Sequence, residues 1–189
     1  MNRKKNFAII LVFLFHNFIL DPSWVLPQEF APIINKYGVE GMPYGEGRHP
    51  GIDYLLPIGT PIVAVSDGII VYVGDDYKDE IYGGGFGVII KHADSFFSFY
   101  YHLSSILVTD GEKIKRGKRI GLSGKSNNGF PHLHFGLLKN AKKGSGGKFS
   151  QSYNPNNYWL NDEPQCFNPQ YDYSRTSNKE ITFPVECSD

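Results

Sequence analysis

Short hydrophobic runs, several of them alternating with polar residues, fill the chain between about residues 41 and 160. Gly, Pro and Asp residues separate these runs, as expected for strands joined by turns. The clearest predicted strands are residues 61–65, 68–73, 87–91, 96–103, 119–122 and 132–138. No segment of convincing length has a helical period. The pattern therefore predicts a mainly β fold with a compact antiparallel β-sheet core.

The last of these runs places two histidines on one face of a strand. Because side chains alternate along a strand, His132 and His134 point the same way. The opposite face is apolar, with Leu133, Phe135 and Leu137, and we expect it to face the core. Two imidazoles crowded on the other face are suited to metal binding or proton transfer, which argues against histidines that are merely buried in the core.

Alternation in the run at 96–103 brings in a third histidine. Phe97, Phe99, Tyr101 and Leu103 form a strongly apolar face, and His102 falls on the other, mixed face. Alone, His102 would be interpreted as a surface histidine. Beside a histidine pair, we interpret it as part of the same site.

A fourth histidine lies near a carboxylate in the segment Arg48-His49-Pro50-Gly51-Ile52-Asp53. In a straight strand His49 and Asp53 would lie roughly 13 Å apart, too far to share one ion. The chain must therefore bend. Pro50 disfavours a helical conformation at His49, and Gly51 permits a kink. Taken alone, a His and an Asp four residues apart are weak support for a site.

Together these residues offer His49, Asp53 and one histidine of the His132/His134 pair as three ligands of a metal ion. Two nitrogens and one carboxylate oxygen suit tetrahedral Zn²⁺, and three protein ligands leave a fourth position for water, as in catalytic sites. Zinc lowers the pKa of bound water from ~15.7 to about 7, so the resulting hydroxide can attack a carbonyl near neutral pH. The remaining histidines would act as general base and as donor to the developing oxyanion.

A set of ordered motifs carries a family resemblance. The motifs are His49-Pro-Gly-Ile-Asp53, Gly59-Thr-Pro-Ile-Val-Ala64 with Asp67-Gly68, Tyr100-Tyr-His-Leu103, Gly117 with Ile120-Gly121, and His132-Leu-His-Phe135. In this combination the chain resembles the lysostaphin/LytM-type zinc peptidoglycan endopeptidases over residues 41–160. The resemblance implies a duplicated-hybrid-motif-like fold with an open groove across the sheet. It also implies peptidoglycan peptides as the substrate.

The resemblance further implies a role for each site residue. His49, Asp53 and His134 match the metal ligands, His132 matches the catalytic base, and His102 matches the histidine that assists at the transition state. Some members of the family have lost ligands and only activate other wall hydrolases, so a non-enzymatic wall-binding regulator is the alternative function. All five positions are filled here, which favours an enzyme.

The chain departs from many relatives in two respects. Gly136 stands where an acidic residue often follows the last motif, and no wall-binding repeat or coiled-coil region is evident. Nothing in the sequence therefore identifies the peptide bond that is cut.

The charge and the length of the chain add expectations about its partners and its domain organisation. The 19 Lys and Arg residues balance 19 Asp and Glu residues, so nothing indicates binding to nucleic acid. A chain of 189 residues suits one domain with appendages, and we expect a monomer.

Three further features receive structural interpretations. The glycine-rich stretch at 83–87 lacks the spacing of a phosphate-binding loop and is expected to join two strands. Ser123 lacks the G-x-S-x-G context of a nucleophile. His92 has no second histidine beside it and is predicted to be a structural or surface histidine.

The two ends of the chain indicate export. Arg3, Lys4 and Lys5 precede an apolar stretch, so residues 1–20 are predicted to be a signal peptide or, if uncleaved, an N-terminal membrane anchor. Residues 21–40 would be a linker or pro-segment, 41–160 the metallopeptidase domain and 161–189 a polar tail. The only two cysteines, Cys166 and Cys187, are expected to form a disulfide in an oxidising compartment. We thus expect a periplasmic, envelope-associated or secreted protein.

Overall fold

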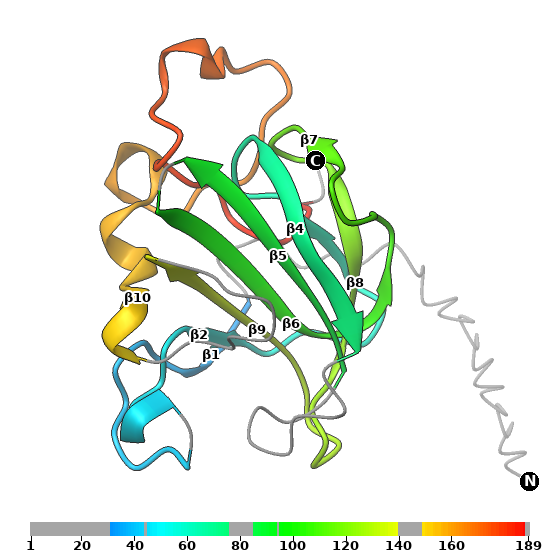
Figure 1. The fold of residues 1–189 in the computed structure, drawn as a ribbon, viewed down its shortest axis with the longest axis vertical. Helices are drawn as coiled ribbons and strands as arrows, with labels where there is room; N and C mark the ends of the chain where they lie inside the picture. Colours follow the sequence, from blue (N-terminus) through cyan, green and yellow to red (C-terminus); the bar gives the residue numbers. More distant parts are fainter. Residues whose placement is uncertain (1–30, 44, 76–84, 94, 140–148, 188–189) are drawn as a thin grey trace, which may run out of the picture.

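A single antiparallel sheet dominates the computed structural model, which describes residues 31–43, 45–75, 85–93, 95–139 and 149–187 (Figure 1). Its strands are β1 Ile33–Asn35, β2 Ile52–Tyr54, β3 Pro61–Val63, β4 Gly68–Asp75, β5 Phe86–Ala93, β6 Phe96–Ile106, β7 Lys113–Ile114, β8 Arg119–Lys125, β9 Pro131–Leu138 and β10 Ser152–Tyr153. Within the described residues the only helices are short 3₁₀ turns: η2 Gly45–Gly47, η4 Phe149–Gln151, η5 Pro155–Asn157, η6 Leu160–Asp162 and η7 Tyr173–Arg175. The prediction of a mainly β, antiparallel fold is confirmed.

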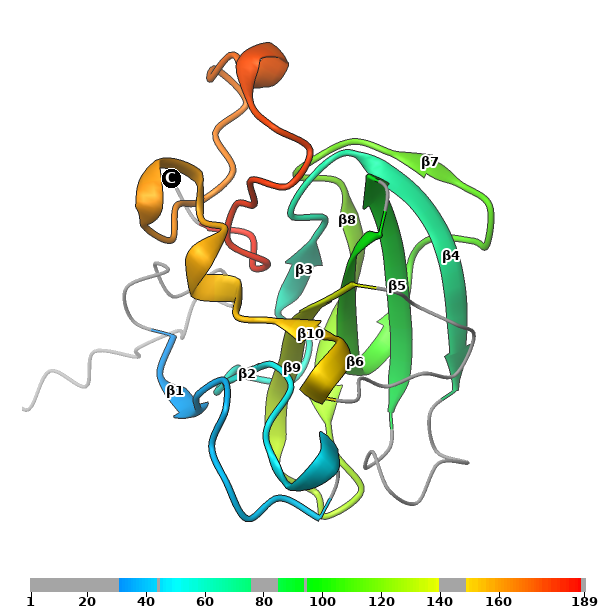
Figure 2. The same ribbon diagram turned by 60° about the vertical axis from the view of Figure 1, so that its left-hand side comes forward.

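Strand β9 pairs with β2, β8, β6 and β10. The path of neighbouring strands runs β1-β2-β9-β8-β6-β5-β4-β7, and β9 additionally pairs with β6 and β10. Figure 2 shows β2, β9 and β6 lying side by side. In this register His134 lies between Asp53 of β2 and Tyr101 of β6, and His132 lies opposite Gly124 of β8. One strand thus gathers residues that are far apart in the sequence.

The main core lies against the apolar face of β9. Leu133, Phe135 and Leu137 are fully buried there, as the alternation predicted. Ile52 and Tyr54 of β2 join them from the neighbouring strand. The two histidines of β9 are therefore on the opposite face of the sheet.

Strand β6 corrects one detail of the prediction. Its apparently mixed face, with Phe96 and Tyr100, packs into the main core, whereas Phe97, Phe99 and Tyr101 form a smaller cluster on the other face. Simple alternation would therefore have pointed residue 102 into the main core. Alternation alone cannot tell which of two apolar faces meets the larger core, because that depends on the neighbouring strands.

The C-terminal segment contributes to the core. Ile181, Phe183 and Val185 are almost completely buried, and Val185 pairs with Ile62 of β3. The predicted disulfide between Cys166 and Cys187 is present and ties this segment together. It fits a protein that folds in an oxidising compartment.

Several expectations concern residues that the structure does not describe. The predicted signal or anchor at 1–20 lies outside the described residues, as do positions 83 and 84 of the glycine-rich stretch. None of the helices in the described parts of the chain is long and apolar enough to cross a membrane.

Candidate metal centre

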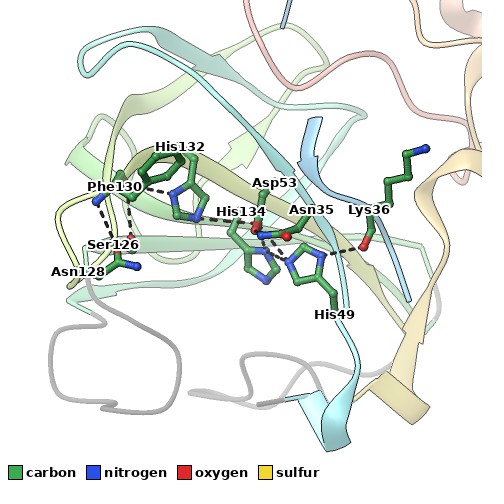
Figure 3. A network of polar contacts seen from close by, with 9 residues as sticks. All are labelled: Asn35, Lys36, His49, Asp53, Ser126, Asn128, Phe130, His132 and His134. Carbon is green, nitrogen blue, oxygen red and sulfur yellow. Dashed lines mark hydrogen bonds and ion pairs between the residues drawn. The ribbon is translucent and has the colours of Figure 1, made fainter. Parts of the chain in front are cut away.

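Three side chains converge on one point at the junction of β2 and β9 (Figure 3). Asp53 and His134 are direct cross-strand partners, so their side chains emerge side by side. His49 comes from the segment before β2. Its Nε2 lies 3.1 Å from Asp53 Oδ1 and 3.1 Å from His134 Nδ1, and His134 Nδ1 lies 2.7 Å from Asp53 Oδ1. The predicted bend between His49 and Asp53 is confirmed.

The glycine in this segment has a different use from the one predicted. Gly51 does not need a left-handed backbone, but a Cβ atom at this position would collide with the carbonyl oxygen of Phe135. The missing side chain allows the chain before β2 to lie tightly against β9. This close approach lets His49 meet a cross-strand pair whose positions the sheet has already set.

The site is buried and places one carboxyl group between two imidazole rings. His49, Asp53 and His134 expose only 0%, 3% and 6% of their surface. Burial would raise the pKa of the Asp53 carboxyl, but His134 and His49 outweigh it and hold that pKa well below its usual range. Burial lowers the pKa of His134 despite the pull of Asp53. The site thus favours an ionised carboxylate beside an unprotonated imidazole, the forms that bind metals.

Asn35 of the preceding strand β1 and Lys36, the residue that follows this strand, support these ligands. Asn35 donates from Nδ2 to Asp53 Oδ2 at 2.8 Å, and the carbonyl oxygen of Lys36 lies 3.1 Å from His49 Nδ1 (Figure 3). Because a carbonyl only accepts, His49 carries its proton on Nδ1 and presents a lone pair at Nε2. Neither residue was predicted to belong to the site, because no spacing signal marks them in the sequence.

The donor set fits zinc. In a tetrahedral site with bonds of about 2.0–2.1 Å, neighbouring ligand atoms are roughly 3.3 Å apart. The three ligand atoms here are separated by 2.7–3.1 Å, so small adjustments would accommodate the ion. Two imidazole nitrogens and a carboxylate oxygen are ligands that zinc accepts readily. The described residues provide these three ligand atoms in one cluster.

His132 lies beside this cluster with a defined orientation. Its Nδ1 donates to the carbonyl oxygen of Phe130 at 3.0 Å, so the neutral ring has its lone pair on Nε2, which lies 3.9 Å from Asp53 Oδ1. Asn128 accepts a hydrogen bond from the backbone N–H of Phe130 at 3.1 Å and so helps to hold the turn (Figure 3). The lone pair of His132 is thus directed toward the metal cluster.

His102 joins the site through an unusual backbone conformation. Its φ angle of 63° lies in the left-handed region, which interrupts the alternation of β6 and brings its ring within 4.5 Å of the His132 ring, centroid to centroid. Glycines make room for this turn. A Cβ on Gly85 would lie 2.8 Å from His102 Cα, and one on Gly124 would lie 2.6 Å from His102 O. The structure thus brings together all five predicted residues.

His92 is separate from this site. Its Nδ1 donates to the carbonyl oxygen of Asp67 at 2.9 Å, and its Nε2 lies 2.7 Å from Ser98 Oγ. Burial lowers the pKa of His92 to about 4. Of the two predicted interpretations, a structural or a surface histidine, these contacts support the structural one.

Two residues that the sequence analysis discussed also have structural roles. Ser123 is buried and donates to the carbonyl oxygen of Pro57, so its hydroxyl belongs to the packing of β8. At Gly136 a side chain would collide with the ring of Phe99. The acidic residue common in relatives therefore has no space here.

Comparisons with known proteins agree with this arrangement. The model of a family described as peptidase family M23 matches residues 47–145, more than half of the chain. Peptidoglycan DD-endopeptidase ShyA of Vibrio cholerae is 34% identical over 125 residues, covering 66% of this chain and 27% of that protein. Murein hydrolase activator NlpD of Escherichia coli is 32% identical over 120 residues, covering 64% and 29%.

A solved structure shares the fold. The catalytic domain of the antimicrobial peptidase lysostaphin from Staphylococcus simulans superposes with a TM-score of 0.55 at 31% identity, covering 66% of this chain and 89% of that domain. Together with the convergence of the three ligand atoms, these matches confirm the prediction of a zinc site. The chain aligns with only about a quarter of the length of the two full-length relatives.

Proposed function

The chain belongs to peptidase family M23, and on that premise we propose that it is a zinc-dependent endopeptidase of the bacterial cell envelope. Its substrates would be peptide cross-links or stem peptides of peptidoglycan. The residues proposed to act are His49, Asp53 and His134 as metal ligands, with His132 and His102 beside them. We further propose that the protein is exported, which agrees with its disulfide.

The convergence of the three ligand atoms beside a second pair of imidazoles carries this proposal. A purely structural zinc site is closed by four protein ligands, whereas three ligands leave a position for chemistry. The described residues offer three, and His132 faces the same cluster without being part of it. This arrangement suits hydrolysis better than structural support.

A zinc ion bound to His49, Asp53 and His134 would supply Lewis-acid chemistry, polarising a substrate carbonyl and lowering the pKa of water. The chain's own residues supply the rest. The hydrogen bond from His132 Nδ1 to the Phe130 carbonyl oxygen directs Nε2 toward the site, where Nε2 can accept a proton and later return it to the leaving amine. His102, whose ring is next to that of His132, is placed to donate a hydrogen bond to the developing oxyanion.

Hydrolysis of purified peptidoglycan tests the proposal. We expect the full-length protein to release soluble peptides, a chelator to stop the release, and added zinc to restore it. Mass spectrometry of the products would identify the bond. The variant His134→Ala should be inactive under the same conditions. Cleavage that persists both in this variant and in the presence of chelator would contradict the proposal.

The similarity to NlpD supports one alternative, a non-enzymatic regulator that binds the wall and activates other hydrolases. The complete set of five site residues favours the enzyme over this alternative. Metal analysis separates the two. The enzyme should retain about one zinc ion per chain, whereas a regulator has no need of a zinc ion. A protein that lacks zinc and stimulates a separate hydrolase would support the regulator.

A further inference from the structure

Strand β1 lies along the edge of the metal centre, although it precedes the segment that matches the family model. The model match begins at residue 47, and β1 spans Ile33–Asn35. These residues fall in the stretch that the sequence analysis interpreted as a linker or pro-segment. In the structure β1 pairs with β2, the strand that carries Asp53. Backbone pairing therefore connects β1, at the edge of the sheet, to the strand that carries Asp53.

A β-bulge sets the position of Asn35. Ile33 pairs with Tyr54 and Asn35 pairs with Asp53, so β1 uses one residue more than β2 over the same stretch. Such bulges redirect a side chain relative to the regular alternation of a strand. Here Asn35 is placed directly opposite Asp53, and its amide nitrogen reaches Asp53 Oδ2 at 2.8 Å.

Asn35 and Lys36 each contact one of the two polar atoms in the side chain of a metal ligand. Asp53 Oδ2 is occupied by the Asn35 amide, so Oδ1 faces His49 and His134. His49 Nδ1 is occupied by the Lys36 carbonyl oxygen, so Nε2 faces the same point. Two consecutive residues thus satisfy the outward-facing atoms of two ligands and leave the inward-facing atoms for a metal.

We propose that Asn35 is a positioning residue of the metal centre, acting together with the backbone carbonyl of Lys36. The proposal rests on the proposed function, because it assumes that zinc binds at Asp53. An amide suits this task because its N–H donates to one carboxylate oxygen while carrying no charge that would compete with the ion. Groups that orient metal ligands in this way typically contribute a factor of about 10–100 to metal affinity.

Zinc affinity, measured by competition with a chromophoric chelator, tests the proposal in the full-length protein. We expect Asn35→Ala to bind zinc about 10–100-fold more weakly than the native protein. Ile34→Ala is the matched control. The Ile34 side chain lies in the same strand and is 40% exposed, so zinc affinity should not change. Asn35→Gln keeps the amide donor and should recover part of the loss.

A spectroscopic measurement separates positioning from simple destabilisation. With cobalt in place of zinc, a changed orientation of Asp53 should shift the visible absorption bands of Asn35→Ala, whereas partial unfolding would only reduce their intensity. If Asn35→Ala binds zinc as tightly as the native protein, the proposal is wrong. It is equally wrong if the affinity falls while the cobalt bands stay in place, or if Asn35→Gln behaves like Asn35→Ala.

The variant His49→Ala distinguishes this proposal from the one on which it rests. Unchanged zinc binding by His49→Ala, or no binding by the native protein, would refute the metal centre itself. Zinc binding that depends on His49 but not on Asn35 would refute only the role of Asn35.

Discussion

The histidine site has two halves that differ in charge and support. In one half His49 and His134 surround a buried carboxylate, and Asn35 of β1 and the following residue, Lys36, contact two of the three ligands. In the other half the rings of His132 and His102 lie next to each other at a tilt, and Asp53 Oδ1 is 3.9 Å from His132 Nε2. Both halves lie on the same side of β9, yet their surroundings suit different tasks.

This difference fits the tasks that we propose for the two halves. A metal ligand has to keep one lone pair on one atom, so it gains from a permanent charge and from hydrogen bonds that fix its orientation. A proton-transferring histidine must change its protonation state during each reaction cycle. It therefore needs a defined orientation without a close ion pair that would hold it protonated.

The largest expected effect is the loss of the metal from the first half. His134→Ala and His49→Ala should each reduce bound zinc from about one per chain to almost none, because two protein ligands cannot hold it firmly. Metal analysis after dialysis measures this. Full zinc occupancy in both variants would remove the distinction between the halves.

Changes in the second half should separate catalysis from metal binding. His132→Ala should retain zinc but lower kcat by about 10²–10⁴-fold, the usual contribution of a general base. Steady-state kinetics on a defined peptide, combined with metal analysis, measures both quantities. A variant that loses zinc and activity together would show that His132 belongs to the metal half.

His92 sharpens the comparison as a histidine that belongs to neither half. Its pKa is about 4 in the folded protein and about 6.5 when unfolded, so between these values the unfolded chain binds more protons. The contribution of neutral His92 to the free energy of unfolding is therefore fully present above pH 6.5 and is lost as the pH falls toward 4. From pH 7 to 4.5 the loss should be about 2–3 kcal/mol. Urea unfolding at both pH values should show a loss of stability that is smaller by this amount in His92→Gln than in the native protein.

The smallest expected effect concerns the support of the catalytic half. Asn128→Ala removes an acceptor for the backbone N–H of Phe130, whose carbonyl orients His132. We expect kcat to fall by about tenfold with zinc retained, equivalent to roughly 1.4 kcal/mol. Asn127→Ala, at the neighbouring exposed position, is the matched control. Equal kinetics in the two variants would show that the turn does not orient the base.

The sequence by itself indicated six of the strands, namely β3, β4, β5, β6, β8 and β9, and the five residues that the structure brings together. The alternation at 132–138 separated His132 and His134 from the core face, because a strand can present only two faces. The spacing between His49 and Asp53 required a bend. These conclusions depend on local geometry, which a sequence pattern records directly.

Only the tertiary structure decided how the site is assembled and supported. The face of β6 that meets the larger core, the left-handed turn at His102 with Gly85 and Gly124 around it, and the contact of Asn35 with Asp53 all depend on partners far away in the sequence. Such pairings are set by the order and register of strands in the folded sheet, and a local pattern contains no information about which distant strand lies alongside.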